Sequence, residues 1–345
     1  MIPSNPKILF IANAGPAIGG GHVMRCLTLA QAFGARGAVC AFANTEDVAA
    51  LLDVFAPDMP REAASALDSN ALVDTVTAAK FGAVVFDHYG LGRGEHLSLA
   101  DGKPCLVIDD LADRALGGDI VLDSGPARNL LDYTLLMDGK ARLLLGPDYA
   151  PVRADFAALR QGALARRGQP VRRVMITMGL SDPAGITERI VDHLRPRLSD
   201  IALDVVLGGQ SASLKALTRI ASRDSRLSVH VDTPDMAQIM SQADLLVSAA
   251  GSTIWEGATL GLPMLLITVA DNQAAAAESM AARNAAIVLD GRSADLENDL
   301  SRAIVRVMAD ATLRAQLSSA AAEICDGGGA ARVADAFLDL INSRG

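Results

Sequence analysis

The sequence predicts an α/β protein made of two doubly wound, Rossmann-type domains. Three observations favour this fold class. The chain has 345 residues, enough for two domains of roughly 100–200 residues. Short apolar runs alternate with Ala-rich amphipathic stretches, as is typical of parallel sheets covered on both faces. This alternation stops once, at a basic segment closed by Gly168 and Pro170, and then restarts. We therefore expect domains at 1–167 and 168–345, with the last helix able to pack back on the first.

The apolar runs of the first half predict its strands, and the amphipathic stretches predict its helices. The expected strands are Lys7–Ala12, Ala83–Asp87, Cys105–Asp109, Asp119–Asp123 and Arg142–Leu145. The expected helices are Gly21–Arg36, Asn70–Lys80, Gly92–Asp101 and Arg153–Arg166.

The second half repeats the pattern. Its expected strands are Arg173–Met178, Ala202–Leu207, Leu227–His230, Asp244–Ser248 and Met264–Thr268. Its expected helices are Pro183–Leu194, Ser213–Ser222, Met236–Gln242, Ser252–Leu260 and Asn272–Arg283. Two or three further helices follow Ala294, and Gly327–Gly329 separates the last pair.

Composition restricts the class of partner. The net charge of -9 argues against nucleic acid or an anionic membrane surface. The 4 cysteines lie far apart and lack metal-site spacing, which indicates reduced thiols. No apolar run approaches the roughly 18 residues of a membrane span, and no signal peptide is evident. We expect a cytoplasmic monomer that needs no metal or cofactor and does not insert stably into membranes.

Ligands of open parallel sheets bind beyond the carboxyl ends of the strands, so the turns after the strands are the first candidates. The first turn holds Gly19, Gly20 and Gly21, followed by His22 in the first helical turn. The positive end of the helix dipole disfavours an imidazolium, so His22 suits a general base. An incidental histidine beside a glycine turn is the equally weighted alternative.

Polar residues also follow the later strands of the first half. Asp87 and Tyr89 are candidate substrate contacts with His88 nearby, although a capping aspartate and an edge tyrosine explain them as well. The adjacent Asp109 and Asp110 could divide acid and base roles. A structural role is favoured for that pair.

The second half offers a candidate phosphate site. Gly251, Ser252 and Thr253 open a helix whose backbone N–H groups and hydroxyls suit a diphosphate. Glu256, one turn later, could accept hydrogen bonds from two ribose hydroxyls, whereas a capping box is the structural alternative.

Two other turns of the second half carry candidate ligands. Gly179 and Asp182 lie in a strand-to-helix turn, where Asp182 could also be a helix cap. Asn272 and Gln273 follow the last predicted strand, and their amides could position a sugar or pyrophosphate.

Together these turns resemble the nucleotide-sugar half of a GT-B protein, in which two domains face a cleft. The resemblance narrows to the PseG/SpsG-type proteins, whose motifs occur here in the same order between Ile8 and Arg283. The matching runs are GGGHVMRCLTLA at 19–30, DHY at 87–89, DDLA at 109–112, LGPDYA at 145–150, GSTIWE at 251–256 and ADNQ at 270–273.

The best-known activity of that family is a UDP-sugar hydrolase of pseudaminic acid biosynthesis, which serves surface or flagellin glycosylation. It releases UDP and a free 2,4-diacetamido-2,4,6-trideoxyhexose without a metal. The resemblance implies that His22 activates the water that attacks the anomeric carbon. It also implies that Tyr89 and Asn272 line the sugar site, and that UDP is held by Gly179, Gly251, Ser252, Thr253 and Glu256.

The chain departs from the family pattern at two places. An Arg-x-Asp pair after the first strand is replaced by Ile11-Ala12-Asn13, and a Gly-Gly-x-Asp run reads Gly179-Leu180-Ser181-Asp182. Two other functions therefore stay open. One is a GT-B glycosyltransferase that uses a UDP-amino-sugar donor, and the other is a non-catalytic nucleotide-sugar binding protein.

Overall fold

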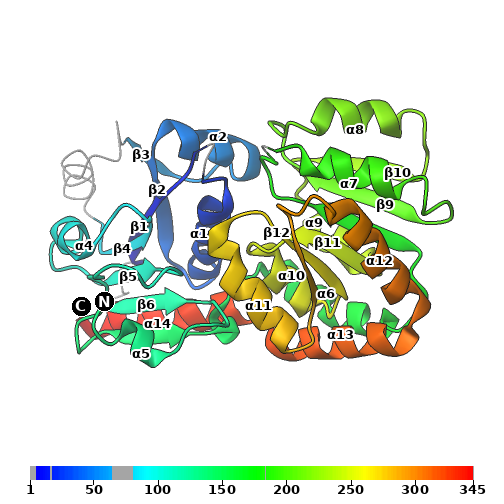
Figure 1. Ribbon diagram of the computed structural model, residues 1–345. Coiled ribbons are helices and arrows are strands. Elements are labelled where there is room, and N and C mark those ends of the chain that lie inside the picture. Colours follow the sequence, from blue (N-terminus) through cyan, green and yellow to red (C-terminus); the bar gives the residue numbers. More distant parts are fainter. Residues whose placement is uncertain (1–4, 16–17, 64–80, 183, 345) are drawn as a thin grey trace. The chain divides into compact units, whose positions relative to one another are not determined.

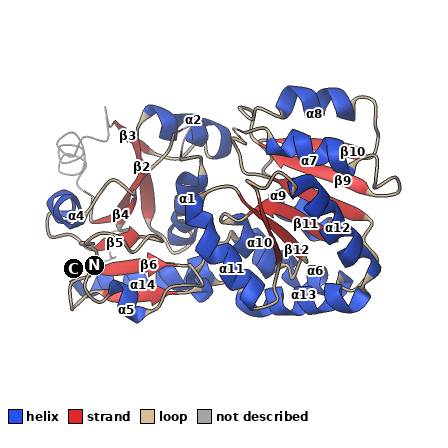
Figure 2. Cartoon of the chain, viewed as in Figure 1, coloured by secondary structure: helices blue, strands red, loops and turns tan. Residues whose placement is uncertain are grey.

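The computed structural model describes residues 5–15, 18–63, 81–182 and 184–344. The chain divides into two compact units, coloured in sequence order in Figure 1. The first unit contains Met1–Pro151 and Gly328–Gly345, and the second contains Val152–Gly327. Each is a parallel-sheet α/β domain with helices flanking its strands (Figure 2). The predicted fold class of two Rossmann-like domains is confirmed.

The first unit is built on a seven-stranded parallel sheet of order β3-β2-β1-β4-β5-β6-β7. Alternate residues of β1 lie in two hydrophobic clusters, Ile8 and Phe10 in one and Leu9 and Ile11 in the other, so both faces of the sheet are buried. The strands are β1 Lys7–Ala12, β2 Val39–Asn44, β3 Arg61–Ala63, β4 Ala83–Asp87, β5 Cys105–Ile108, β6 Ile120–Asp123 and β7 Arg142–Leu145.

The strand order reverses between β1 and β4, which creates the switch point where doubly wound sheets bind ligands. The helices around this sheet are α1 Gly21–Gly34, α2 Glu46–Phe55, α4 Arg93–Ala100, α5 Leu130–Tyr133, the 3-10 helix η1 Pro147–Tyr149 and α14 Gly329–Arg344.

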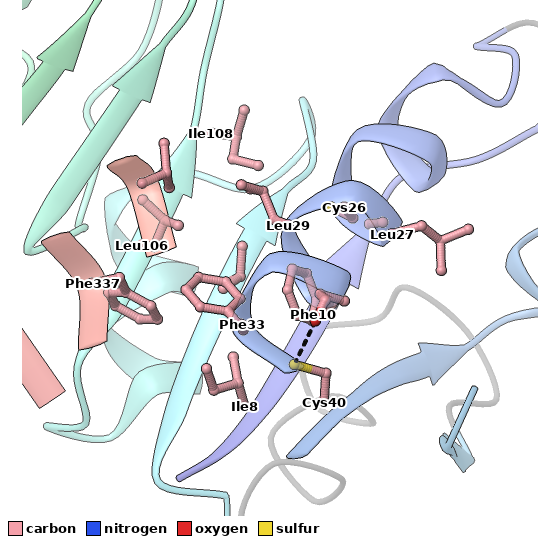
Figure 3. Close-up of a cluster of buried hydrophobic side chains, with 14 of the residues drawn as sticks. Ile8, Phe10, Cys26, Leu27, Leu29, Phe33, Cys40, Leu106, Ile108 and Phe337 are labelled. Carbon is pink, nitrogen blue, oxygen red and sulfur yellow. Dashed lines mark hydrogen bonds between the residues drawn. The ribbon is translucent and has the colours of Figure 1, made fainter. Parts of the chain in front are cut away.

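Aromatic side chains join the C-terminal helix to the core of the first unit (Figure 3). The rings of Phe10 and Phe42 stack with centroids 5.0 Å apart. Phe33 of α1 lies 6.0 Å from Phe10 and 5.7 Å from Phe337 of α14, and all four side chains are fully buried. The chain therefore returns to its first unit through α14.

The second unit is built on a six-stranded parallel sheet of order β10-β9-β8-β11-β12-β13, with its switch point between β8 and β11. Its strands are β8 Arg173–Thr177, β9 Ala202–Leu207, β10 Leu227–Val231, β11 Leu245–Ala249, β12 Met264–Thr268 and β13 Ile287–Asp290. Its helices are α6 Ala154–Arg166, α7 Ile186–Leu194, α8 Leu214–Ala221, α9 Met236–Gln242, α10 Thr253–Thr259, η2 Asp271–Gln273, α11 Ala274–Ala282, α12 Leu296–Ala309 and α13 Ala311–Ile324.

The division between the units at Pro151 and Val152 precedes the expected boundary at 167/168. The reason is α6, which is held to the second unit by arginine side chains. Arg160 donates hydrogen bonds to the carbonyls of Thr259, Ala322 and Cys325. No sequence pattern indicated these long-range contacts.

Most predicted strands and helices are present within a few residues of their expected ends. The helix expected at Asn70–Lys80 lies outside the described residues. The expected elements did not include the strands β2, β3 and β13 or the helices α2 and α5. Among the described residues, no helix is both long enough and apolar enough to span a bilayer.

Replacing Phe337 by alanine tests the attachment of α14. We expect Phe337→Ala to lower the free energy of unfolding by about 3–5 kcal/mol, because a fully buried ring leaves a cavity. Urea unfolding followed by circular dichroism measures the loss. Asp339→Ala, at an exposed position of the same helix, is the matched control and should change stability by less than about 0.5 kcal/mol. A comparable loss in both variants would contradict the assigned role of Phe337.

Candidate active site

The switch point of the first sheet brings the ends of β1 and β4 together. Ala12 pairs with Asp87 in register, and the backbone N–H of Asn13 donates to the Asp87 carbonyl at 2.8 Å. After β1 the chain passes through the glycine turn into α1, which carries His22. Residues that are distant in sequence therefore meet at the edge where ligands of such sheets bind.

The glycine turn is closed by its own backbone. The N–H of Gly19 donates to the carbonyl of Gly15 at 2.8 Å, and Gly19 has a φ of +79°, which glycine adopts without strain. A Cβ built at Gly19 or Gly21 would meet no atom within 4 Å. Both glycines therefore border open space, as a ligand-facing turn requires.

His22 is held by Asp87, which Arg25 binds in turn. Its Nδ1 lies 2.5 Å from Asp87 Oδ1, and its side chain is 7% exposed. Arg25 grips the same carboxylate with two nitrogens, Nε at 2.5 Å from Oδ2 and Nη2 at 2.6 Å from Oδ1. A third nitrogen, Nη1, donates to Asp110 Oδ2 at 2.9 Å. These contacts leave His22 little rotational freedom.

The short contact with Asp87 defines the tautomer of His22. Burial favours the neutral acid, but the charge of Arg25 and the hydrogen bonds from Arg25 and His22 prevail and hold the pKa of Asp87 well below its usual value. Asp87 is therefore a carboxylate and only accepts hydrogen bonds. A contact of 2.5 Å requires that Nδ1 carries the proton and donates it. In the neutral ring, Nε2 then carries the lone pair that can accept a proton.

This geometry corrects the prediction that Asp87 contacts substrate. Asp87 has no exposed surface, and its oxygens are occupied by His22, Arg25 and the thiol of Cys26. The carboxylate thus acts through His22. Arg25 was not among the predicted site residues, and only its spacing of three residues after His22 could have indicated a shared helix face. Asp110, for which a structural role was favoured, accepts a hydrogen bond from Arg25.

Tyr89 and His88 border His22. The Tyr89 ring meets the His22 ring edge-on, with centroids 4.5 Å apart. Burial, assisted by the nearby His22, lowers the pKa of His88 to about 4, so His88 is uncharged near neutral pH. Its Nδ1 accepts from the N–H of Gly90 at 3.0 Å. The proton of His88 therefore resides on Nε2.

A second acidic cluster follows β5 and β6. The hydroxyl of buried Tyr133 lies 3.1 Å from Asp109 Oδ2 and 2.9 Å from Asp123 Oδ2. One hydroxyl hydrogen serves only one of these oxygens, so both contacts are attractive when one carboxyl is protonated. Asp109 also accepts from Arg114, whereas burial raises the pKa of Asp123 to about 6. Asp123 is therefore the carboxyl that takes up a proton as the pH falls to about 6. The structural role favoured for Asp109 is consistent with these contacts.

In the second unit, the turn after β8 contains two predicted UDP contacts, Gly179 and Asp182, whose surroundings differ. Gly179 has a φ of +90° and no atom within 4 Å of a built Cβ. Asp182 is 2% exposed, and its carboxylate accepts from the N–H groups of Ile186 and Thr187 and from the Ser213 hydroxyl. The carboxylate caps α7. This engagement corrects the prediction that Asp182 binds UDP.

The turn after β11 keeps its polar groups available. Gly251 again borders open space, and Ser252 makes no side-chain capping bond at the start of α10. Ser252 is exposed and Thr253 is half-buried. The capping-box alternative is therefore not realised at Ser252. Burial, opposed in part by Arg153, raises the pKa of Glu256 to about 7.

The turn after β12 contains the two predicted amides. Gln273 uses its Oε1 to accept from the N–H of Val269 at 3.0 Å, which shapes the turn. Asn272 is exposed. Within the described part of the chain, no group of three His, Cys, Asp or Glu side chains could hold a metal ion.

Known proteins are similar to this chain in sequence and in fold. Residues 174–333 match the glycosyltransferase family 28 C-terminal domain. The Bacillus subtilis spore coat polysaccharide biosynthesis protein SpsG is 27% identical over 207 residues, which cover 59% of this chain and 60% of SpsG. The Campylobacter jejuni UDP-2,4-diacetamido-2,4,6-trideoxy-beta-L-altropyranose hydrolase is 25% identical over 277 residues, 80% of this chain and 96% of that enzyme. The chain is a homologue of the PseG/SpsG-type proteins.

Solved structures confirm the GT-B-like fold of this homologue. MurG of Acinetobacter baumannii superposes with a TM-score of 0.65 at 17% identity, covering 97% of this chain and 99% of MurG. The resemblance predicted from the ordered motifs is confirmed. The relatives include a hydrolase and glycosyltransferases, so the comparisons support a nucleotide-sugar-related enzyme.

The Asp123 carboxyl makes stability depend on pH. Its folded pKa of about 6 exceeds the ordinary value of 3.8, so stability falls as pH rises from about 4 to 6 and then levels off. Asp123→Asn mimics the neutral acid. At pH 8 its free energy of unfolding should exceed that of the parent by on the order of 2–3 kcal/mol. At pH 4 the difference should vanish. Denaturant titrations at both pH values test this, with the exposed Asp58→Asn as control, and an Asp123 variant destabilised at pH 8 would contradict it.

Proposed function

We propose that the chain is a metal-independent UDP-sugar hydrolase that releases UDP and a free sugar. The observation that carries the proposal is the His22–Asp87 contact of 2.5 Å. It commits Nδ1 to Asp87 and makes Nε2 the proton acceptor. His22 Nε2 takes a proton from water while the water oxygen bonds to the anomeric carbon. The bond from that carbon to the diphosphate oxygen breaks, and UDP leaves with the electron pair. A positioned base of this kind contributes about 10²–10⁴-fold.

The second unit supplies the UDP half of this proposal. Gly179, Gly251, Ser252 and Thr253 lie in turns at the switch point of its sheet, where phosphate groups bind α/β domains. Backbone N–H groups stabilise developing negative charge on the leaving group without a basic surface. Glu256 accepts hydrogen bonds from the ribose hydroxyls. The match to the glycosyltransferase family 28 C-terminal domain supports this assignment.

The proposed sugar is a 2,4-diacetamido-2,4,6-trideoxyhexose, the substrate class in the name of the Campylobacter relative. Gly19, Gly20, Gly21, Tyr89, Asn272 and Gln273 are the proposed substrate contacts. Ile11, at the first departure from the family pattern, is fully buried in the core and does not face a ligand. Asn13 directly follows β1 and is buried. The reaction would take place in the cytoplasm, and its product would enter nonulosonate biosynthesis, which serves surface glycosylation.

A glycosyltransferase is the second candidate, favoured by the family 28 match and by the transferases among the relatives. It would share the UDP half and differ in the acceptor. Incubation of a panel of UDP-sugars with EDTA and no acceptor separates the two. UDP release supports the hydrolase, and release that appears only with an acceptor alcohol supports the transferase.

Removing the base tests the role of His22. We expect His22→Ala to reduce UDP release at least about 10²-fold and to leave UDP affinity nearly unchanged, because His22 belongs to the other unit. Turnover assays and calorimetry measure both quantities. His193→Ala, a half-exposed histidine of the second unit, should retain full activity. Near-normal turnover in His22→Ala would remove His22 from the mechanism.

The raised pKa of Glu256 predicts a proton linkage. Ribose hydroxyls donate to the ionised carboxylate, so UDP binding should expel a proton near pH 7 and tighten as pH rises from 6 to 8. Calorimetry in two buffers of different ionisation enthalpy measures the proton released. Glu256→Gln should bind more weakly and release less, whereas the exposed Glu278→Gln should match the parent. Equal proton release in both variants would remove Glu256 from the UDP site.

A further inference from the structure

Arg25 contacts both members of the His22–Asp87 pair as well as a second carboxylate. Its Nη2 lies 2.6 Å from Asp87 Oδ1 and only 3.1 Å from His22 Nδ1. Its Nη1 donates to Asp110 Oδ2 at 2.9 Å. The carboxylates of Asp87 and Asp110 outweigh the effect of burial and raise the pKa of Arg25, so the guanidinium is always charged.

The contact between Arg25 and His22 is not a hydrogen bond in the tautomer deduced above. Nδ1 already carries a proton donated to Asp87, and Nη2 has only protons to offer. Two N–H groups thus lie beside each other at 3.1 Å. A positive charge on the His22 ring would face the fixed positive charge of Arg25 at this distance, which disfavours the imidazolium.

Asp87 acts in the opposite direction. A carboxylate at 2.5 Å favours a protonated ring and, alone, would make His22 a poor base near neutral pH. The other groups around His22 in the described residues are the positive end of α1, Asp110 after β5, and His88 and Tyr89 after β4. His88 is uncharged near neutral pH. The charges that decide the protonation of His22 are therefore those of Asp87, Arg25 and Asp110.

We propose that Arg25 is a positioning residue that keeps His22 uncharged at neutral pH by balancing the field of Asp87. Its two hydrogen bonds to Asp87 also fix the position of the carboxylate that orients the His22 ring. Without this balance Asp87 would hold His22 as an imidazolium, whose Nε2 has no lone pair for a proton from water. The catalytic meaning of this balance rests on the proposed hydrolase function, whereas the protonation of His22 is measurable without turnover.

The experiment is an NMR pH titration of the 5 histidines in the intact protein, with His22→Ala assigning the signal of His22. We expect Arg25→Gln to move the His22 midpoint up by about one pH unit or more, because a like charge is removed. Asp110→Asn should move it down by a smaller amount, since Asp110 offsets part of the Arg25 charge. Asp110 has a partly exposed side chain, so this variant tests the proposal even if Arg25→Gln folds poorly.

Activity provides the second readout. The acid limb of the pH–rate profile should move in the same directions as the midpoints, and raising the pH should restore the turnover of Arg25→Gln. Arg25→Lys, which keeps the charge and loses the bidentate grip, should shift less. Arg36→Gln, an arginine paired with Asp335 just after α1, should leave the titration unchanged.

Opposite shifts in Arg25→Gln and Asp110→Asn support the proposal. An unmoved midpoint in both, or a downward shift in Arg25→Gln, overturns it and leaves Arg25 a structural residue. Expected shifts without any UDP release would refute the hydrolase function and leave the protonation role of Arg25 intact.

Discussion

Asp87 is a fully buried carboxylate at the switch point of the first sheet, and the candidate site is organised around it. A buried charge is costly unless it is paired and hydrogen-bonded. Arg25 supplies two hydrogen bonds and His22 a third, so the requirement to satisfy Asp87 also orients the histidine. The glycine turn and the first turn of α1 must then bring these side chains within reach.

The two units have similar sheet topologies but carry different residues at the ends of their strands. In the first, the strand ends bring together His22, its carboxylate partner Asp87 and a second acidic cluster around Tyr133. In the second, the turns after β8 and β11 are bordered by open space at Gly179 and Gly251, and Asp182 is engaged in capping α7. Parallel strands collect their carboxyl ends on one edge, so each unit presents its polar residues together. This explains how an acidic chain could hold an anionic ligand by local N–H groups.

Much of the fold followed from local patterns. Continuous apolar runs such as the one that begins Ala83–Asp87 predict strands, because a strand buried on both faces does not alternate apolar and polar residues. The ends of those strands then indicated His22 and Gly251. The roles of Asp87 and Asp182 were misjudged, because a carboxylate after a strand has the same appearance whether it faces a ligand or satisfies buried donors. Contacts between residues 62 or 65 positions apart, such as those of Asp87 with Arg25 and His22, leave no periodic signal in the sequence.

In the proposed reaction, water attacks the anomeric carbon with His22 Nε2 as the base. Hydrolysis of the UDP-sugar in water enriched in oxygen-18, followed by mass spectrometry of both products, tests it most directly. We expect the heavy oxygen in the anomeric hydroxyl of the free sugar and not in UDP. Label in the β-phosphate of UDP would mean attack at phosphorus, which contradicts the assignment of His22 to the sugar carbon.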